Sequence, residues 1–457
     1  MEKIHLNHKV GQQRHHAALS RRDFLRYSAL SAVSLAGMGV FAGCAIDPVT
    51  GKQQLMLMSR EQEVAIDRRQ SPFQFSSDYG VTQDTALNQY VAGVGKTLLP
   101  GIHRPDMPYN FQCVNATYIN AYAFPGGSIA VTRGILLELE NEAELAALLG
   151  HELGHVNARH SAEQASKSNL SNLFIGGLSL LASSQGPGLA ELTQQLGSLS
   201  TGLFLSKYSR DNEREADALG HRYMAGARYN SKGFVGLMEM LNGLNKARPS
   251  SVQMLFATHP MSAERLHAAV ERDRNHYAST DSLPLHRDRY MDNIAGLRRK
   301  KEAIRLLQEG EKYLGKEAYD NAETAFRSAI KRADRDYTAH LLMAKCMLIR
   351  KKSAQAVSHA STAKQLYPGE SQGHYISGLA HLMADKPGLA NRDFERCDQI
   401  LPGNPQVTFY RGYALDKDKR KDPAATQYLA YLKAIDYASN KYSQYAYQRL
   451  KAWGYAD

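Results

Sequence analysis

The sequence predicts an α+β protein: a mostly helical domain with one small β-sheet, followed by an all-α solenoid of short helical hairpins. Three observations lead to this prediction. Strand-like alternation is concentrated in residues 109–137, apolar residues at helical spacing dominate elsewhere, and the last third of the chain repeats every 34 residues. A length of 457 residues suits two or three such units.

The N-terminus predicts an export signal of the twin-arginine type. SRRDFLR (20–26) precedes an apolar stretch that runs to Gly43 and is short for a membrane span of about 20 residues. The stretch ends in FAGC, which resembles a lipobox with Cys44 as the lipidated residue. Cleavage after Ala45 is the alternative, and a cytoplasmic protein with an apolar leader is a third interpretation. We expect residues 1–45 to direct export to the periplasm, and Cys44 to tether the product to the outer membrane.

The composition limits the classes of partner that we expect. Hydrophobic residues make up 43% of the chain, as in ordinary globular proteins, and the net charge is +11. The basic residues are dispersed and form no cluster with aromatic side chains, so nucleic acid is not an expected partner, whereas an anionic lipid surface is compatible with the charge. A disulfide between Cys346 and Cys397 is conceivable, but we expect buried free thiols.

Residues 46–285 form the expected first domain. DPVTGKQQLMLMS (47–59) predicts an extended lead-in, and the turn formers at 125–127 predict a β-hairpin within residues 109–137. Residues 165–206 are rich in Gly, Ser, Leu and Ala. They permit three interpretations: a mobile flap, a buried helical hairpin or a membrane contact.

The stretch LLGHELGHVNARH (148–160) predicts a metal site on a helix. His151 and His155 stand four residues apart on one face, with about 5–6 Å between Cβ atoms, and can share one zinc ion. Glu152 lies one step round the helix, where it could take a proton from a water molecule. Two partly buried histidines on an ordinary helix are the alternative. His160 is one position away from the third histidine of a metzincin, so we expect it at the surface or on a second face.

A second helix, predicted at 209–227, offers the third ligand. Glu213 would complete a catalytic set of two histidines and one glutamate, with the fourth zinc position open. Asp217 lies on the same helix face and could accept the second ring N–H of a zinc-binding histidine. Glu215 projects to the opposite side. A charged surface helix is the alternative for this segment.

A third motif, FATHPMSAERL (256–266), makes a family resemblance specific. HELGH, SRDNEREAD and THPMSAER together resemble the HtpX-like zinc metallopeptidases, which are gluzincins, and NAYAFPGGSIAVTRG is similar to the same family. The resemblance implies a zincin-type metallopeptidase domain with one Zn²⁺ per chain. It assigns this ion to His151, His155 and Glu213.

The resemblance also implies roles for the neighbouring residues. Glu152 would be the general base, and Asp217 would support a metal ligand from behind. His259 would lie near the metal and donate to the oxyanion, a contribution of about 2.7–4 kcal/mol. Direct zinc ligation by His259 in a latent resting state is the alternative. Arg265 is expected to order its loop.

A polar linker is predicted at 286–302, followed by a repeat domain at 303–457. Small and aromatic residues recur at steps of 34: Gly310, Ala344, Gly378 and Gly412; Ala322, Ala356, Ala390 and Ala424; Phe326, Ala360, Phe394 and Tyr428. This period, with QLYPG (365–369) recurring as QILPG (399–403), is that of the tetratricopeptide repeat. Four repeats and a capping helix are therefore expected, and such arrays present a concave binding surface.

Together these features predict a zinc-dependent endopeptidase of the bacterial cell envelope. An extended substrate would add as a β-strand at Asn120 and Ala121. The architecture is similar to family members that act during outer-membrane β-barrel assembly. This implies that the partners are misfolded or stalled outer-membrane proteins and their assembly machinery, docked by the repeats. The alternative is a chaperone-like assembly adaptor that acts mainly through its repeats and has a latent metal site.

Overall fold

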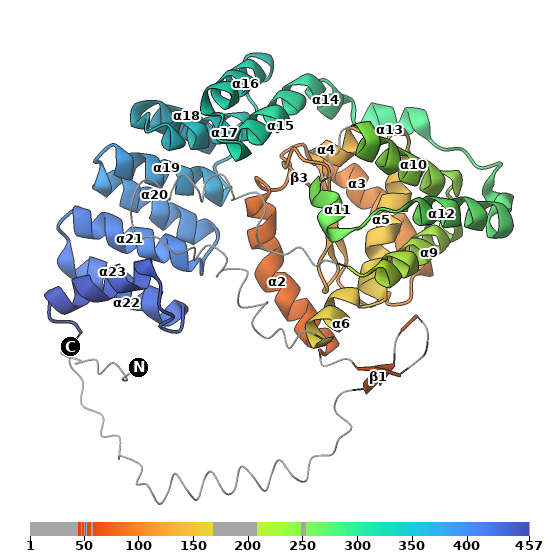
Figure 1. Cartoon of the computed structure of the whole chain (residues 1–457), viewed down its shortest axis with the longest axis horizontal. Coiled ribbons are helices and arrows are strands. Elements are labelled where there is room, and N and C mark those ends of the chain that lie inside the picture. The colour runs from red at the N-terminus through yellow and green to blue at the C-terminus, as the bar shows by residue number, and fades with distance from the viewer. Residues whose placement is uncertain are drawn as a thin grey trace, which may run out of the picture.

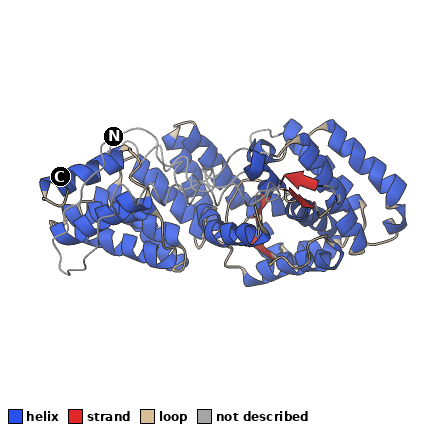
Figure 2. Cartoon of the chain, turned by 90° about the horizontal axis from the view of Figure 1, so that it is seen from below, coloured by secondary structure: helices blue, strands red, loops and turns tan. Residues whose placement is uncertain are grey.

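The computed structural model describes residues 44–46, 48–49, 51, 53–55, 58–167, 208–247 and 253–456. They form two lobes, and the predicted α+β class is confirmed, since a small sheet lies in the first lobe and the second is helical (Figures 1 and 2). The signal before Cys44 and most of the segment 165–206 lie outside the described residues. Among the helices that are described, none is long and apolar enough to cross a bilayer.

Polar caps start several helices of the first lobe. Ser59, Asp84, Asn141 and Ser209 each accept a hydrogen bond from a first-turn amide, which satisfies a donor that the helix itself cannot pair. The helices of this lobe are α2 (Arg60–Ser77), α3 (Thr85–Leu98), η1 (Leu99–Gly101), α4 (Arg133–Leu136), α5 (Glu142–Asn157), α6 (His160–Lys167), α9 (Arg210–Gly226), α10 (Lys232–Ala247), α11 (Gln253–Thr258), α12 (Ala263–His276), η3 (Ala278–Thr280), α13 (Arg287–Asn293) and α14 (Ala295–Arg298).

The sheet of the first lobe has the order β3-β5-β4, formed by β3 (Asn110–Val114), β4 (Ala121–Ala123) and β5 (Ser128–Thr132). The predicted hairpin is β4 and β5, which pair antiparallel around a turn where Gly127 has φ 106°. β3 pairs parallel with β5, so β4 is an edge strand. Within the predicted extended lead-in, β2 (Gln53–Leu55) pairs with β1 (Cys44–Ile46).

Helix α5 is buried along its whole length and packs closely against α9. A Cβ atom added at Gly154 would lie 2.8 Å from the Ala216 carbonyl oxygen, and one added at Gly220 would lie 2.6 Å from the His151 backbone nitrogen. Glycine is therefore required where the two backbones meet. This close approach brings the HELGH motif against the first turn of α9.

The second lobe is a solenoid of paired helices (Figure 1). In the pairs whose second helix carries an aromatic residue at this position, a glycine of the first helix faces the ring. A Cβ added at Gly378 would lie 2.6 Å from the Phe394 ring. The helices are α15 (Lys301–Gly315), α16 (Tyr319–Arg332), α17 (Tyr337–Ile349), α18 (Ser353–Leu366), α19 (Ser371–Met383), α20 (Pro387–Ile400), α21 (Pro405–Lys417), α22 (Lys421–Ala434) and α23 (Lys441–Ala452).

The turn inside each helix pair also repeats every 34 residues in its backbone conformation, although its residue types vary. Glu317, Lys351, Asp385 and Lys419 stand 34 residues apart, and all four adopt a left-handed backbone with φ between 52° and 60°. None of them is glycine, although this conformation is unfavourable for other residues. The repeat is therefore conserved in backbone geometry where its side chains differ.

Residues 286–302, predicted as a linker, form helices that pack on the first lobe. Tyr290 and Leu297 are buried in its core, and the Tyr290 hydroxyl donates to the Leu136 carbonyl at 2.6 Å. The polar composition of the segment gives no hint of this packing, because only a few apolar residues carry it.

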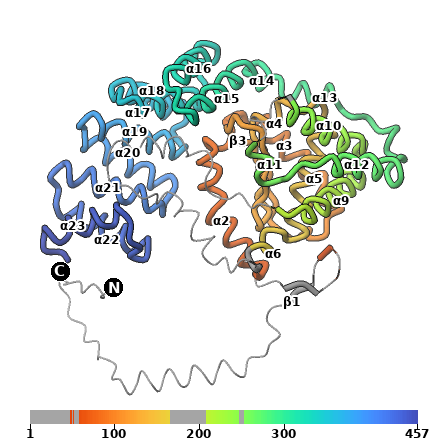
Figure 3. Tube along the Cα trace, in the orientation of Figure 1, coloured from red at the N-terminus to blue at the C-terminus, as the bar shows by residue number. Residues whose placement is uncertain are grey.

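A buried polar surface, which we call the joint, connects the lobes. It comprises residues 76–82, 115–118 and 133 of the first lobe and residues 308–311, 336, 345 and 370–372 of the repeats. Arg133 Nη1 donates to Asp336 Oδ2 at 2.6 Å, and the Tyr79 hydroxyl donates to Glu311 Oε1 at 2.6 Å. Figure 3 shows α2 running beside the repeats, where its end contacts α19. The repeats are thus packed on the first lobe and are not merely tethered to it.

Candidate metal centre

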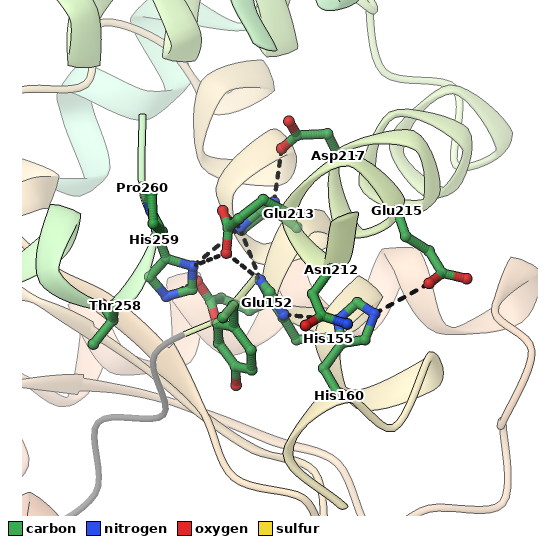
Figure 4. A network of polar contacts seen from close by, with 12 residues as sticks. Glu152, His155, His160, Asn212, Glu213, Glu215, Asp217, Thr258, His259 and Pro260 are labelled. Atoms are coloured by element: carbon green, nitrogen blue, oxygen red, sulfur yellow. Dashed lines mark hydrogen bonds and ion pairs between the residues drawn. The ribbon is translucent and has the colours of Figure 1, made fainter. Parts of the chain in front are cut away.

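The predicted metal-binding side chains come from three segments and meet at one buried point. Helix α5 supplies His151 and His155, α9 supplies Glu213 from its first turn, and His259 follows α11 directly. Figure 4 shows His155, Glu213 and His259 close together. All four are buried, and one ligand atom from each lies within 4.8 Å of the others.

The distances place nitrogen and oxygen atoms around a common centre. His151 Nε2 lies 3.1 Å from His155 Nε2 and 3.3 Å from His259 Nδ1. Glu213 Oε1 lies 3.4 Å from His155 Nε2 and 3.1 Å from His259 Nδ1. Three imidazole nitrogens and a carboxylate oxygen are a typical donor set for zinc. Converging acceptors of this kind need a proton or a cation between them, so the site fits a bound metal ion.

The protonation states of His155 and Glu213 also suit metal binding, which requires a neutral imidazole and an ionised carboxylate. Burial lowers the pKa of His155 well below its usual value, so the ring is neutral at pH 7. Burial alone would raise the pKa of Glu213, but His259, His155 and Arg265 outweigh it and hold this pKa well below its usual value. Burial would lower the pKa of His259, but Glu213 and Glu152 more than compensate and raise it.

Glu152 lies beside the donors and is not one of them. Its Oε1 is 3.9 Å from His259 Nε2, the side chain is 1% exposed, and Oε2 has no hydrogen-bond partner among the described residues. Burial raises the pKa of this carboxyl, and the nearby histidines offset the increase only in part. A carboxylate with a raised pKa and a free oxygen is suited to accepting a proton.

Arg265 organises the acidic residues behind the centre. Its Nη1 lies 2.7 Å from Glu213 Oε2, its Nε and Nη2 each donate to Asp217 at 2.7 Å, and Nη1 also donates to the Pro260 carbonyl at 3.0 Å. Asp217 Oδ1 in turn lies 3.0 Å from His151 Nδ1. The loop contact was expected, but the direct contact with Glu213 was not. Its only sequence signal is the arginine of THPMSAER.

The expected position of His160 is wrong. His160 is buried at 1% exposure, and its Nδ1 lies 2.9 Å from Nδ1 of His155. Its Nε2 lies 3.2 Å from Glu215 Oε2, so Glu215 also faces this region (Figure 4). The physical reason is a break in the helix: α5 ends at Asn157, and Arg159 reverses the chain with φ 57°. The helical spacing of α5 therefore does not extend to residue 160, so it cannot predict where the His160 side chain lies.

The two residues predicted to bind substrate, Asn120 and Ala121, are not among those that line the pocket beside His155. Asn120 and Ala121 are fully buried where edge strand β4 begins. The Asn120 backbone N–H donates to Thr132 Oγ1 at 3.1 Å, and its carbonyl accepts from the Thr132 backbone N–H at 3.1 Å. Tyr208, which no motif indicated, stacks on His155 with ring centroids 3.8 Å apart. Tyr208, His155 and Ala123 line one small pocket, so β4 ends close to the metal ligands.

Comparison with known proteins gives related sequences for this region. Residues 85–273 match the family model of Peptidase family M48. Metalloprotease YcaL of Escherichia coli (strain K12) is 30% identical over 199 residues, which cover 44% of this chain and 74% of YcaL. The beta-barrel assembly-enhancing protease of Escherichia coli O157:H7 is 30% identical over 195 residues, covering 41% of this chain and 39% of that protein. The chain thus spans about two fifths of the length of the latter relative.

Proposed function

This chain belongs to peptidase family M48, and on that premise we propose that it is a zinc-dependent endopeptidase of the bacterial cell envelope. The observation that carries the proposal is the convergence of four buried donors beside a buried glutamate. His151, His155 and Glu213 would hold one Zn²⁺ per chain, with Asp217 and Arg265 fixing His151 and Glu213 from behind.

A zinc ion held there supplies Lewis acidity, which activates water and polarises a carbonyl group. Glu152 takes the proton of the attacking water and passes it to the leaving amine, a role worth roughly 10²–10⁴ in rate. Its free Oε2 and its raised pKa support this role.

His259 donates to the oxyanion in this proposal, and the raised pKa of its ring supports a donor. Its Nδ1, however, also lies among the four converging atoms, which favours a second candidate function. With His259 as a fourth ligand no position is left for water. The protein would then be latent as a peptidase and would act as a chaperone-like assembly adaptor through its repeats.

The substrate is an extended segment that adds to β4 at Asn120 and Ala121. Support comes from β4 being an edge strand that packs on α5. Pairing with a strand edge reads the substrate backbone, so it suits unfolded or edge-exposed proteins.

The cellular role follows from the sequence and from the relatives. A twin-arginine signal at 1–45 with Cys44 as a lipid anchor would hold the protein in the periplasm at the outer membrane. The peptidase domain at 46–285 would act on misfolded or stalled outer-membrane proteins, which the repeats at 303–457 dock together with their assembly machinery. Relatives named beta-barrel assembly-enhancing protease support these clients.

The test is zinc content and cleavage of an unfolded casein-type substrate by the purified protein, compared with Glu152→Gln and His259→Ala. We expect one zinc per chain throughout and loss of cleavage in Glu152→Gln. Lower cleavage in His259→Ala supports the oxyanion donor, and higher cleavage supports the latent fourth ligand. A zinc-loaded protein that cleaves in no variant would refute the peptidase and favour the adaptor.

A further inference from the structure

We propose that His160, backed by Glu215, is a positioning residue that fixes the ring of the metal ligand His155. This inference rests on the proposed function, because it concerns how the zinc site is held in place. No motif of the chain assigns a role to either residue.

The contacts form a continuous line from the centre outwards. His155 directs Nε2 to the other donors and Nδ1 to His160 Nδ1, at 2.9 Å, with the two rings edge to face at 72°. His160 Nε2 continues to Glu215 Oε2 at 3.2 Å (Figure 4). His160 is 1% exposed and the Glu215 side chain is 30% exposed, so the line leads from the core to the surface.

Hydrogen-bond chemistry then allows one placement of the protons. When Nε2 of His155 binds a metal, its Nδ1 carries the hydrogen and must donate. His160 Nδ1 therefore accepts, and its remaining hydrogen lies on Nε2, from which it donates to the Glu215 carboxylate. Each residue in the line thus determines the tautomer of the next.

The backbone is built to hold this arrangement. Arg159 has a left-handed backbone, and its side chain is anchored by Glu63 Oε1 at 3.1 Å and by the Met58 carbonyl at 2.6 Å. The turn places His160 at the first residue of α6, next to the last turns of α5. A non-glycine residue in this conformation persists only when its surroundings fix it.

The two metal histidines on α5 are therefore supported differently. His151 Nδ1 faces the carboxylate of Asp217 directly, which is a common arrangement behind metal ligands. His155 reaches its carboxylate, Glu215, through one additional imidazole. Among the residues that the structure describes, His160 is the only hydrogen-bond partner of His155 Nδ1. Replacing His160 therefore removes this partner, whereas replacing Glu215 keeps it but removes the carboxylate that orients it.

The test uses the full chain with His160→Phe, His160→Asn and Glu215→Ala, and Asp211→Asn as the matched control. Asp211 lies on the same helix as Glu215, pairs with Arg214 and is 86% exposed. Zinc affinity is measured by competition with a chromophoric chelator. The visible spectrum of the cobalt-loaded protein reports ligand geometry independently of activity.

We expect His160→Phe to lower zinc affinity by about 10–100-fold and to change the cobalt spectrum. His160→Asn keeps an acceptor near the position of Nδ1, so it should recover most of the affinity. Glu215→Ala, at a partly exposed site that tolerates truncation, should show a smaller loss, and Asp211→Asn none.

If the wild type binds zinc and cleaves substrate, while His160→Phe and Glu215→Ala bind zinc as tightly as the wild type, this inference is wrong. The proposed function would still stand. Equal losses in His160→Phe and His160→Asn would also overturn the inference, because the acceptor would then be irrelevant. A wild-type protein that takes up no zinc would instead overturn the proposed function.

Discussion

The metal centre and the joint are both buried and polar, but their atoms face each other in opposite ways. In the joint, donors of one lobe meet acceptors of the other: Arg133 faces Asp336, and Tyr79 faces Glu311. In the centre, imidazole nitrogens face one another, with His151 Nε2 only 3.1 Å from His155 Nε2. Burial and charge alone do not distinguish these clusters. Imidazole nitrogens that face one another indicate a binding site, because they need a shared proton or a cation. A donor that faces an acceptor, as in the joint, indicates a structural contact.

The largest effect is expected at Arg265, which pairs with two buried carboxylates. Arg265→Met should lower the free energy of unfolding by about 3–5 kcal/mol without metal, because Glu213 and Asp217 lose their partner. Added zinc should restore part of the loss, since it supplies positive charge at Glu213. Urea unfolding with and without zinc measures both. If zinc restores none of the lost stability, Arg265 has a structural role like that of the residues in the joint.

The ion pair of the joint should behave differently. Arg133 and Asp336 side chains are each 4% exposed, so Arg133→Met or Asp336→Leu alone should cost about 3–5 kcal/mol, because each leaves a buried charge without its closest partner. The double variant should regain most of this loss, because no buried charge is left unpaired. About 1 kcal/mol should stay lost, because Asp336 also caps α17 through the Ala339 backbone N–H. Zinc should change none of these values. A zinc-dependent loss, or additive single effects, would contradict the distinction between the two clusters.

The smallest effect is expected from pH, at Asp78 within the joint. Burial raises the pKa of Asp78 to about 6, although the hydroxyls of Tyr118 and Tyr122 oppose this, and nearby Glu311 raises it further. The folded state therefore binds the proton more tightly than the unfolded chain. The contribution of Asp78 to stability should therefore fall as pH rises from about 4 to about 6, by roughly 3 kcal/mol.

Thermal or urea unfolding across this pH range checks the expectation. Asp78→Asn should flatten the profile, whereas Asp106→Asn, at an exposed carboxylate, should leave it unchanged. Equal profiles for wild type and Asp78→Asn would show that Asp78 does not titrate in this range.

Local patterns predicted much of this architecture. The 34-residue period gave the solenoid, and the spacing of HELGH with the acidic first turn of α9 gave the donors His151, His155 and Glu213, because each pattern lies within one helix. The hairpin of β4 and β5 was also predictable from the turn formers at 125–127.

Features that depend on distant or irregular contacts were not predictable. His160 was misplaced because one left-handed residue, Arg159, ends the helical periodicity. The pairing of Arg133 with Asp336 joins residues 203 positions apart, and nothing local identifies either as buried. Tyr208 stacks on His155 from outside every motif.

The left-handed turns of the repeats have a modular consequence. Since Asp385 and Lys419 have the same backbone conformation at equivalent positions, deleting residues 386–419 would join Asp385 to Arg420 with the local geometry preserved. The deleted unit contains none of the residues that define the joint. Whole repeats can thus be removed from or added to the outer end of the solenoid. Such changes alter the length of the solenoid, whereas its contact with the first lobe at the joint stays the same.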